Sequence, residues 1–304
     1  MPFSAQRTSA ALAGMIALLG VAGSACSAGT EEQTRPMAAA ERWTPPAISS
    51  TGYEASPTFT PDGQTMFYIA SDPNFSTYKV MQSRCGPDGW GKPETPSFAV
   101  PLPVIEADPF VTHDGKRLYY ISSRHSPKDQ DFDIWFVDRT KDGGWGEPQR
   151  LPEPVNSKGA ELLPRTDGEG RLYFGSDRPG GQGKGDIYVA TQDAVGQWSV
   201  SNVGPPISTA AFEYEVEVSR DAKTMITVTD RGDRSHLYHY ERGAKGWTEI
   251  GKIPAKEDVF QVGPLLSPKG DRLLFAQKDG ERSGEMFVMD LKPGADRSWP
   301  PNCR

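Results

Sequence analysis

Six of the seven tryptophans in this 304-residue chain recur at nearly constant intervals. Neighbouring members of the series lie 47 to 55 residues apart, and the series is Trp43, Trp90, Trp145, Trp198, Trp247 and Trp299. A repeat of about 50 residues is typical of β-propellers, in which each repeat forms one four-stranded antiparallel blade. We therefore predict an all-β propeller fold.

In three repeats the first strand begins with the pattern Glu-x-x-Pro, at Glu54–Pro57, Glu106–Pro109 and Glu161–Pro164, and the fourth and fifth repeats have Glu213–Val216 and Gln261–Pro264 instead. Proline has no N–H to donate to a neighbouring strand, so in a sheet it is found at an edge. This strand is therefore predicted to be the innermost one, lining the central channel. An Asp-Gly or Pro-x-Gly turn follows, and then a continuous apolar run such as 66–69, which is typical of a strand buried on both faces.

The repeat count predicts five blades, with six as the alternative. Residues 43–48 are similar to the end of a fourth strand, such as 204–208, but no first three strands precede them. The fifth repeat in turn stops soon after Trp299. We therefore expect residues 43–48 to supply the outer strand of the last blade, which closes the ring.

The third repeat, residues 161–199, carries the most complete pattern, including Leu172–Ser176, Asp186–Tyr188 and Trp198. It resembles the WD-repeat-like "Pro-Asp" propeller family of TolB and of OmpA-associated envelope proteins. The resemblance covers residues 43–299 in five copies, although Asp221-Ala222 and Gln261 depart from the pattern. It implies an envelope propeller, but TolB has six blades and a further domain for which this chain has no room.

The N-terminus resembles a bacterial lipoprotein signal. Arg7 precedes an apolar core at residues 10–22, which is too short to span a membrane, and small residues then lead to Cys26. We predict a signal peptide at 1–25, lipidation of Cys26, a flexible tether at 26–42 and the propeller at 43–304. Ordinary cleavage after Ala25 is the alternative. The expected location is the periplasm or the outer membrane, with the lipid as the only membrane contact.

The two other cysteines, Cys85 and Cys303, would be an even pair in an oxidising compartment. We predict a disulfide between them, with two unpaired thiols as the alternative. The formal net charge of −7 and the absence of a basic stripe argue against nucleic-acid binding.

One channel mouth is predicted to collect charged side chains, because the starts of the first strands and the ends of the second strands share a face. The candidate binding residues are Glu54, Glu106, Asp108, Glu161, Glu213, Gln261, Arg124, Arg178 and Arg231. They could form an acidic funnel for a cationic or polyhydroxyl partner. Alternatively, each glutamate could pair with a nearby arginine and only fasten two strands together. The loops between second and third strands, which vary most between repeats, lie on the same face and favour it as the binding surface.

We predict a non-catalytic scaffold that binds an envelope protein or peptide, or a carbohydrate. The enzymatic alternatives are a five-bladed glycoside hydrolase that uses the channel carboxylates, or a metal-dependent lactonase or esterase. His236 and His239 fall on opposite faces of a strand, so no metal site is predicted. No cofactor is indicated, and Ca²⁺ enters only with the lactonase alternative.

Overall fold

The computed structural model describes residues 39–303, apart from 75, 128–130, 256–258 and 281. The predicted signal peptide, Cys26 and most of the predicted tether lie outside the described residues. Within the described part of the chain, no helix is long and apolar enough to cross a membrane.

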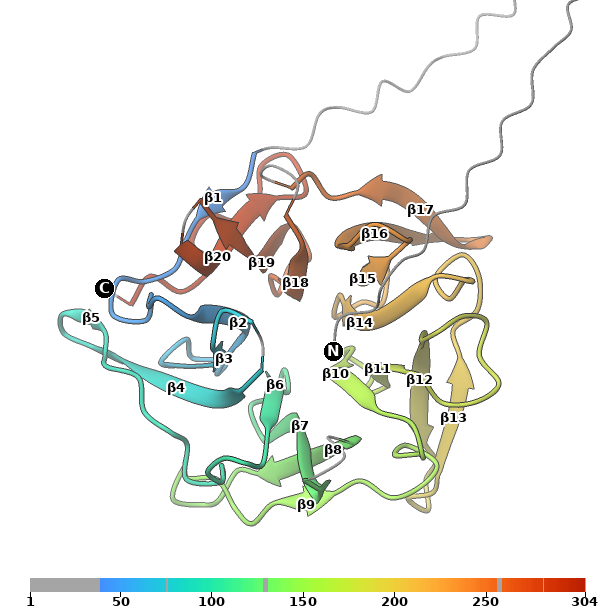
Figure 1. The fold of residues 1–304 in the computed structure, drawn as a ribbon, viewed down its shortest axis with the longest axis horizontal. Helices are drawn as coiled ribbons and strands as arrows, with labels where there is room; N and C mark the ends of the chain where they lie inside the picture. Colours follow the sequence, from blue (N-terminus) through green and yellow to red (C-terminus); the bar gives the residue numbers. More distant parts are fainter. Residues whose placement is uncertain (1–38, 75, 128–130, 256–258, 281, 304) are drawn as a thin grey trace, which may run out of the picture. The chain divides into compact units, whose positions relative to one another are not determined.

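Five four-stranded antiparallel sheets surround a central axis, as predicted (Figure 1). Blade 1 contains β2 (Tyr53–Phe59), β3 (Thr65–Ser71), β4 (Tyr78–Gly86) and β5 (Gly89–Trp90). Blade 2 contains β6 (Glu106–Val111), β7 (Arg117–Ser126), β8 (Asp131–Asp138) and β9 (Gln149–Arg150). Blade 3 contains β10 (Glu161–Thr166), β11 (Leu172–Ser176), β12 (Asp186–Gln192) and β13 (Trp198–Asn202). Blade 4 contains β14 (Phe212–Val218), β15 (Thr224–Asp230), β16 (Ser235–Gly243) and β17 (Gly246–Lys252).

The N-terminal strand closes the ring, as predicted. Blade 5 contains β18 (Gln261–Leu266), β19 (Arg272–Asp279), β20 (Arg282–Asp290) and, as its outer strand, β1 (Glu41–Arg42). The pairing begins earlier than the predicted residues 43–48, with Glu41 opposite Val288. The N–H groups of Trp43 and Thr44 still donate to the carbonyl of Met286. Pro45 and Pro46 follow, and because they have no N–H the ladder ends there.

The recurring tryptophans pack against neighbouring blades. Trp43, Trp90 and Trp299 surround the ring of Phe59, with centroid distances of 5.7, 6.0 and 6.4 Å. These three residues come from both ends of the repeat series, so their cluster fills the junction between blades 1 and 5.

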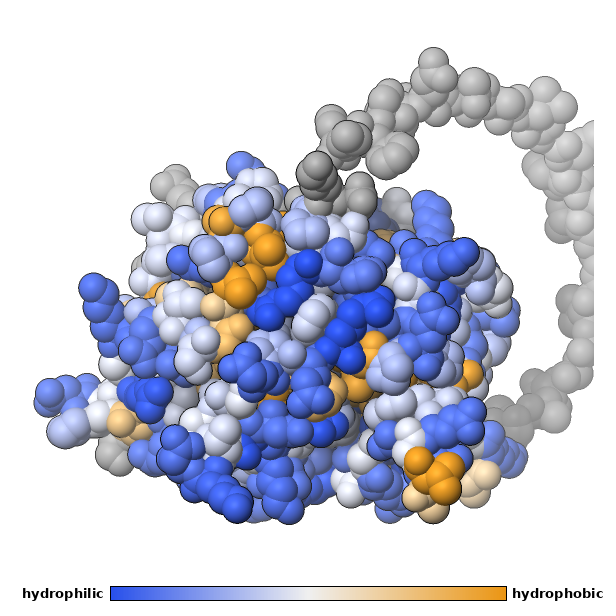
Figure 2. Space-filling view, turned by 90° about the horizontal axis from the view of Figure 1, so that it is seen from below, coloured by the Kyte–Doolittle hydropathy of each residue, from blue (hydrophilic) through white to orange (hydrophobic). Residues whose placement is uncertain are grey.

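The side of the molecule in Figure 2 is mainly hydrophilic and shows only small, separate hydrophobic patches.

A disulfide spans the same junction. Cys85, in β4 of blade 1, is bonded to Cys303 near the C-terminus, and their Cα atoms lie 5.3 Å apart. The bridge links residues separated by 218 positions. It therefore ties blade 1 to the segment that follows blade 5.

Candidate functional site at the channel mouth

The innermost strand of each blade carries a β-bulge directly after its first residues. The pairing of β6 with β7 shifts between Ala107 and Phe110, and equivalent shifts occur in the other four blades. In four blades the residue before Pro has positive φ: Ser56 (47°), Asp108 (51°), Leu163 (45°) and Gly263 (62°). A bulge re-aims the side chains beside it. Here it separates the glutamate that opens each strand from the residue two positions later.

The glutamates that open the strands are buried inside the blades. Glu161 accepts hydrogen bonds from the Ser157 hydroxyl (2.6 Å), the Ser176 hydroxyl (3.1 Å) and Arg178 Nη2 (2.9 Å). The Ser157 N–H donates to its second oxygen, at 3.2 Å. All these donors belong to the preceding loop or to the second strand of the same blade. Glu161 therefore holds the first strand, the second strand and the incoming loop together.

The equivalent residues in the other blades have the same kind of partner. Glu106 pairs with Arg124 and accepts the N–H of Val100, while the Thr209 hydroxyl donates to Glu213 at 2.6 Å. The Ser50 hydroxyl donates to Glu54. Gln261 accepts the N–H of Leu237 and donates to the carbonyl of Pro254.

Arg231 lies elsewhere. Its guanidinium pairs with Glu249 of β17 at 2.7 Å and sits over the ring of Tyr238, so it faces the outer part of blade 4. Of the nine residues predicted for the channel mouth, only Asp108 lines a pocket there. Seven of the other eight connect strands and loops. Gln261 links blade 5 to Leu237 of blade 4, and the rest act within their own blades: Glu54, Glu106, Glu161, Glu213, Arg124 and Arg178.

This pocket, which we call the mouth pocket, has a volume of about 270 Å³ and opens on the face where the innermost strands begin. Its walls are mostly apolar or aromatic. They consist of Ile69, Tyr78, Ala107, Ile121, Leu162, Tyr214, Phe260 and Val262. The remaining lining residues are Ser56, Asp108 and Glu215, which come from the bulges.

The two carboxylates of the mouth pocket are held by neighbouring blades. Asp108 accepts the Ser56 hydroxyl at 3.0 Å and the N–H of Leu163 at 3.2 Å. Glu215 Oε2 accepts the N–H of Gly263 at 2.8 Å. Only glycine fits at Gly263, since an added Cβ would lie 2.5 Å from the nitrogen of Ser56. The bulge residues thus form a ring, in which contacts link blade 1 to blades 2 and 5, blade 2 to blade 3, and blade 4 to blade 5.

Arg165 occupies the channel beyond this ring, and its exposed fraction is 0%. Its Nε donates to Glu217 Oε2 at 2.6 Å, and its Nη1 donates to the carbonyl of Pro164 at 2.9 Å. Its guanidinium carbon lies 5.2 Å from the ring centroid of Phe110. This buried cation therefore fills the channel next to the ring of bulges without lining the mouth pocket.

Burial controls the protonation of these acids. Asp108 and Glu215 are 6% and 9% exposed. Desolvation and, to a smaller extent, the negative charge of Asp108 raise the pKa of Glu215 to about 8. Desolvation also raises the pKa of Asp108, although Arg165 opposes this effect. Because ionisation of one carboxyl hinders ionisation of the other, the pair retains a proton near neutral pH.

Sequence reasoning missed Tyr214, Arg165 and Glu217, and it gave no special role to Glu215. One signal could have found them, because these residues break the repeat. Where blade 4 has Tyr214-Glu215, blade 1 has Ala55-Ser56 and blade 5 has Val262-Gly263. The glutamates that recur at the strand starts connect strands and loops. The acids that depart from the repeat, Asp108, Glu215 and Glu217, face the channel.

No group of three or more histidine, cysteine, aspartate or glutamate side chains is arranged to hold a metal ion among the residues that the structure describes. His236 and His239 are both buried in β16. The predicted absence of a cofactor is not tested by the structure.

No protein-family model and no curated protein matches the chain. Solved structures match it at low identity. TolB from Acinetobacter baumannii has a TM-score of 0.52 and 18% identity over 81% of this chain and 56% of that one. This chain thus covers just over half of that TolB structure. A TolB-type structure from Agrobacterium tumefaciens gives 0.53 and 14%, over 81% and 80% of the two chains.

A family 117 glycoside hydrolase from Zobellia galactanivorans is equally similar. Its TM-score is 0.54 at 13% identity, and the match covers 86% of this chain and 92% of that one. At such identities the likeness concerns the fold alone. The chain therefore shares its propeller fold with TolB propellers and with a glycoside hydrolase.

Proposed function

We propose that the protein is an exported propeller, tethered to a membrane through Cys26, that binds a partner at the mouth pocket without catalysing a reaction. The partner presents a basic group on an apolar stem, such as a lysine side chain or a peptide N-terminus. The observation that carries this proposal is that Asp108 and Glu215 line the same apolar, aromatic-walled pocket and interact electrostatically.

The composition of the pocket supports a basic group. Arg165 only partly offsets the charge of the two carboxyls, and an ammonium ion supplies further opposite charge together with hydrogen-bond donors. Tyr78, Tyr214 and Phe260 offer aromatic surface to the stem. Because the acid pair retains a proton near pH 7, binding of a cation should release a proton, and affinity should rise between pH 6 and 8.

The N-terminus supports export. Its apolar core at 10–22, followed by small residues and Cys26, has the length and order of a lipoprotein signal. The disulfide between Cys85 and Cys303 fits an oxidising compartment. Intact mass of the mature protein tests this part: an unmodified Cys26, or an N-terminus at Ala25 or earlier, contradicts it.

Glycoside hydrolysis is the second candidate. It is favoured by two carboxyl groups with raised pKa values in one pocket, because glycosidases use a protonated carboxyl as general acid and a second carboxyl group as nucleophile or base. The pocket lining argues against it. A sugar needs several polar groups to bind its hydroxyls, and the lining has only Ser56, Asp108, Glu215, Tyr78 and Tyr214.

A capture experiment from envelope extract tests the binding function. The wild-type protein is compared with Asp108→Asn/Glu215→Gln and with the control Glu147→Gln/Glu153→Gln, which replaces two carboxyl groups at exposed positions. We expect wild type and control to retain a partner that the pocket variant loses. A panel of aryl glycosides is assayed in parallel, and turnover abolished only by the pocket variant would replace binding with catalysis.

A further inference from the structure

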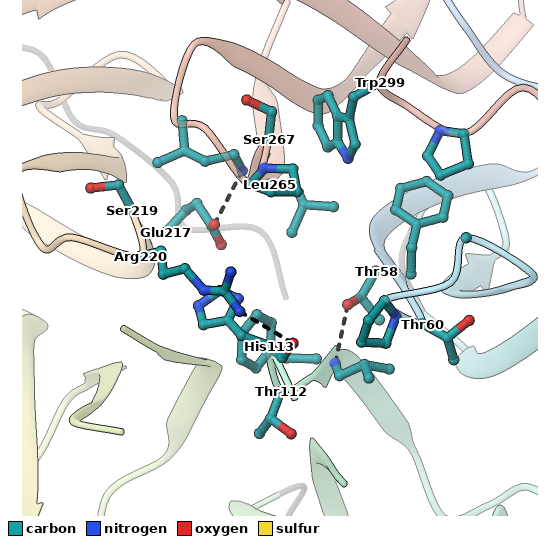
Figure 3. Close-up of a pocket in the computed structure, with 18 of the residues that line it drawn as sticks. Thr58, Thr60, Thr112, His113, Glu217, Ser219, Arg220, Leu265, Ser267 and Trp299 are labelled. Carbon is teal, nitrogen blue, oxygen red and sulfur yellow. Dashed lines mark hydrogen bonds between the residues drawn. The ribbon is translucent and has the colours of Figure 1, made fainter. Parts of the chain in front are cut away.

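A second pocket, of about 240 Å³, lies on the opposite face, where the innermost strands turn back into the second strands. We call it the turn-face pocket. Blades 1, 2, 4 and 5 contribute to its walls, and Trp299 near the C-terminus completes them (Figure 3). Arg165 is buried between the residues that line the two pockets, and it lines neither of them. The two pockets are therefore separate sites.

Arg220 is the positive charge of the turn-face pocket. Figure 3 shows its side chain extending over His113 toward the middle of the pocket, across from Trp299. Its Nη2 donates to the carbonyl of His113 at 3.3 Å. Among the described residues, no carboxylate lies within ion-pair distance of its guanidinium, which leaves several N–H donors without a protein acceptor.

The nearby acidic groups have other partners. Glu217, at the inner end of the pocket, pairs with Arg165 and accepts the N–H of Leu266 at 3.1 Å. Asp167 pairs with Arg171 at 2.6 Å, and Asp114 lies 3.4 Å from Lys116.

His113 adds no competing positive charge. Its Nε2 contacts the carbonyl of Thr166 at 2.9 Å, so this nitrogen carries the proton. Burial and the neighbouring Arg220 lower the pKa of His113, which keeps the ring neutral at pH 7. The pocket therefore presents one fixed cation beside a neutral imidazole.

Apolar and aromatic side chains form the opposite wall. Trp299 and Phe59 lie with ring centroids 6.4 Å apart at 80°, and Phe110 contacts His113 edge to face at 5.8 Å. A ligand with a planar apolar body can pack on these rings. A carboxylate at its end would then reach the guanidinium, which binds carboxylates through two parallel hydrogen bonds.

We propose that the turn-face pocket is a second binding site, specific for a small carboxylate with a flat or apolar body, and that Arg220 determines this specificity. The ligand's carboxylate accepts hydrogen bonds from Arg220, and its body lies against Trp299. The site is independent of the mouth pocket. The acids of the mouth pocket, Asp108 and Glu215, favour cations instead.

Nuclear magnetic resonance titration of the purified protein, labelled with ¹⁵N at tryptophan, tests this proposal. The probes are 3-phenylpropionate and its neutral analogue 3-phenylpropanamide, and Trp299→Phe assigns the indole signal. We expect the carboxylate to shift the Trp299 signal and to bind at least about five times more tightly than the amide. Arg220→Gln should weaken carboxylate binding by a similar factor, and Arg220→Lys should restore part of it.

Arg242→Gln is the matched control. It removes the same charge from the same blade, but Arg242 stacks on Trp247 and does not line the pocket. This variant should bind the carboxylate as wild type does. Equal binding of acid and amide to the wild-type protein, an Arg220→Gln variant within twofold of wild type, or no shift of the Trp299 signal at ~10 mM probe would each overturn the proposal.

Discussion

Arg165 Nε lies 2.6 Å from Glu217 Oε2 in the centre of the propeller, and both side chains are almost completely buried. The two residues come from blades 3 and 4, so their ion pair joins innermost strands across the channel. Removing one member of a buried ion pair leaves an uncompensated charge, which costs far more than an exposed pair contributes.

Arg165→Met should therefore destabilise the fold by about 3–5 kcal/mol. Glu217, Asp108 and Glu215 would all lose their shared cation. Urea unfolding measures the change, and Arg165→Met/Glu217→Gln should recover part of it. A single variant as stable as wild type would show that Arg165 does not compensate the channel acids.

Glu215→Gln should change how stability depends on pH. The folded-state pKa of Glu215 is raised to about 8 from the usual value of 4.5, so the folded state binds a proton more tightly than the unfolded state. This contribution is complete below about pH 4.5 and is lost as the pH rises through 8. The melting temperature of wild type should thus fall more steeply between pH 5 and 9 than that of Glu215→Gln. Parallel curves would contradict the raised pKa.

Glu161→Gln should lower stability by about 1–3 kcal/mol without affecting either pocket. The four donors to Glu161 suit two acceptor oxygens, and an amide places its own N–H groups against some of them. Thermal unfolding and probe binding are measured on the same sample. Unchanged stability with weakened probe binding would restore the functional-funnel hypothesis for these glutamates.

The disulfide between Cys85 and Cys303 should stabilise ring closure. Replacing both residues by serine removes a constraint over 218 positions and should cost about 2–4 kcal/mol. Comparing the melting temperatures of the double variant and of wild type, each with and without reductant, checks this. If reductant changes the melting temperature of neither protein, and the variant has the same melting temperature as wild type, the disulfide does not contribute to stability.

The blade architecture could be predicted because its anchors recur along the chain: the tryptophan, and a strand start that is Glu-x-x-Pro in three repeats and differs at one position in the other two. The bounds of the closing strand could be predicted less closely. Only Glu41 and Arg42 form the paired strand, and Pro45, which has no N–H, ends the ladder before the predicted residues 45–48. The candidate site was harder to predict. Sequence places Glu106 and Asp108 two positions apart on one strand, whereas a bulge with φ of 51° at Asp108 sends them into different environments.

The partners across the channel could not be predicted either. Asp108 and Glu215 come from blades that are not adjacent, and Arg165 meets Glu217 across two innermost strands. Such contacts depend on how far each side chain reaches toward the axis. The sequence shows that these four residues depart from the repeat, which indicates that they differ in role from their equivalents. It does not show which of them contact one another.

The most direct test of the account is the affinity of the mouth pocket for a basic probe. Isothermal titration with 2-phenylethylammonium is performed at pH 7 on wild type, on Asp108→Asn/Glu215→Gln and on the surface control Glu147→Gln/Glu153→Gln. We predict that wild type and control bind with equal affinity, and that the pocket variant binds at least about tenfold more weakly while remaining folded. Equal affinity of all three proteins, or no binding by wild type, would contradict the assignment of this pocket as the binding site.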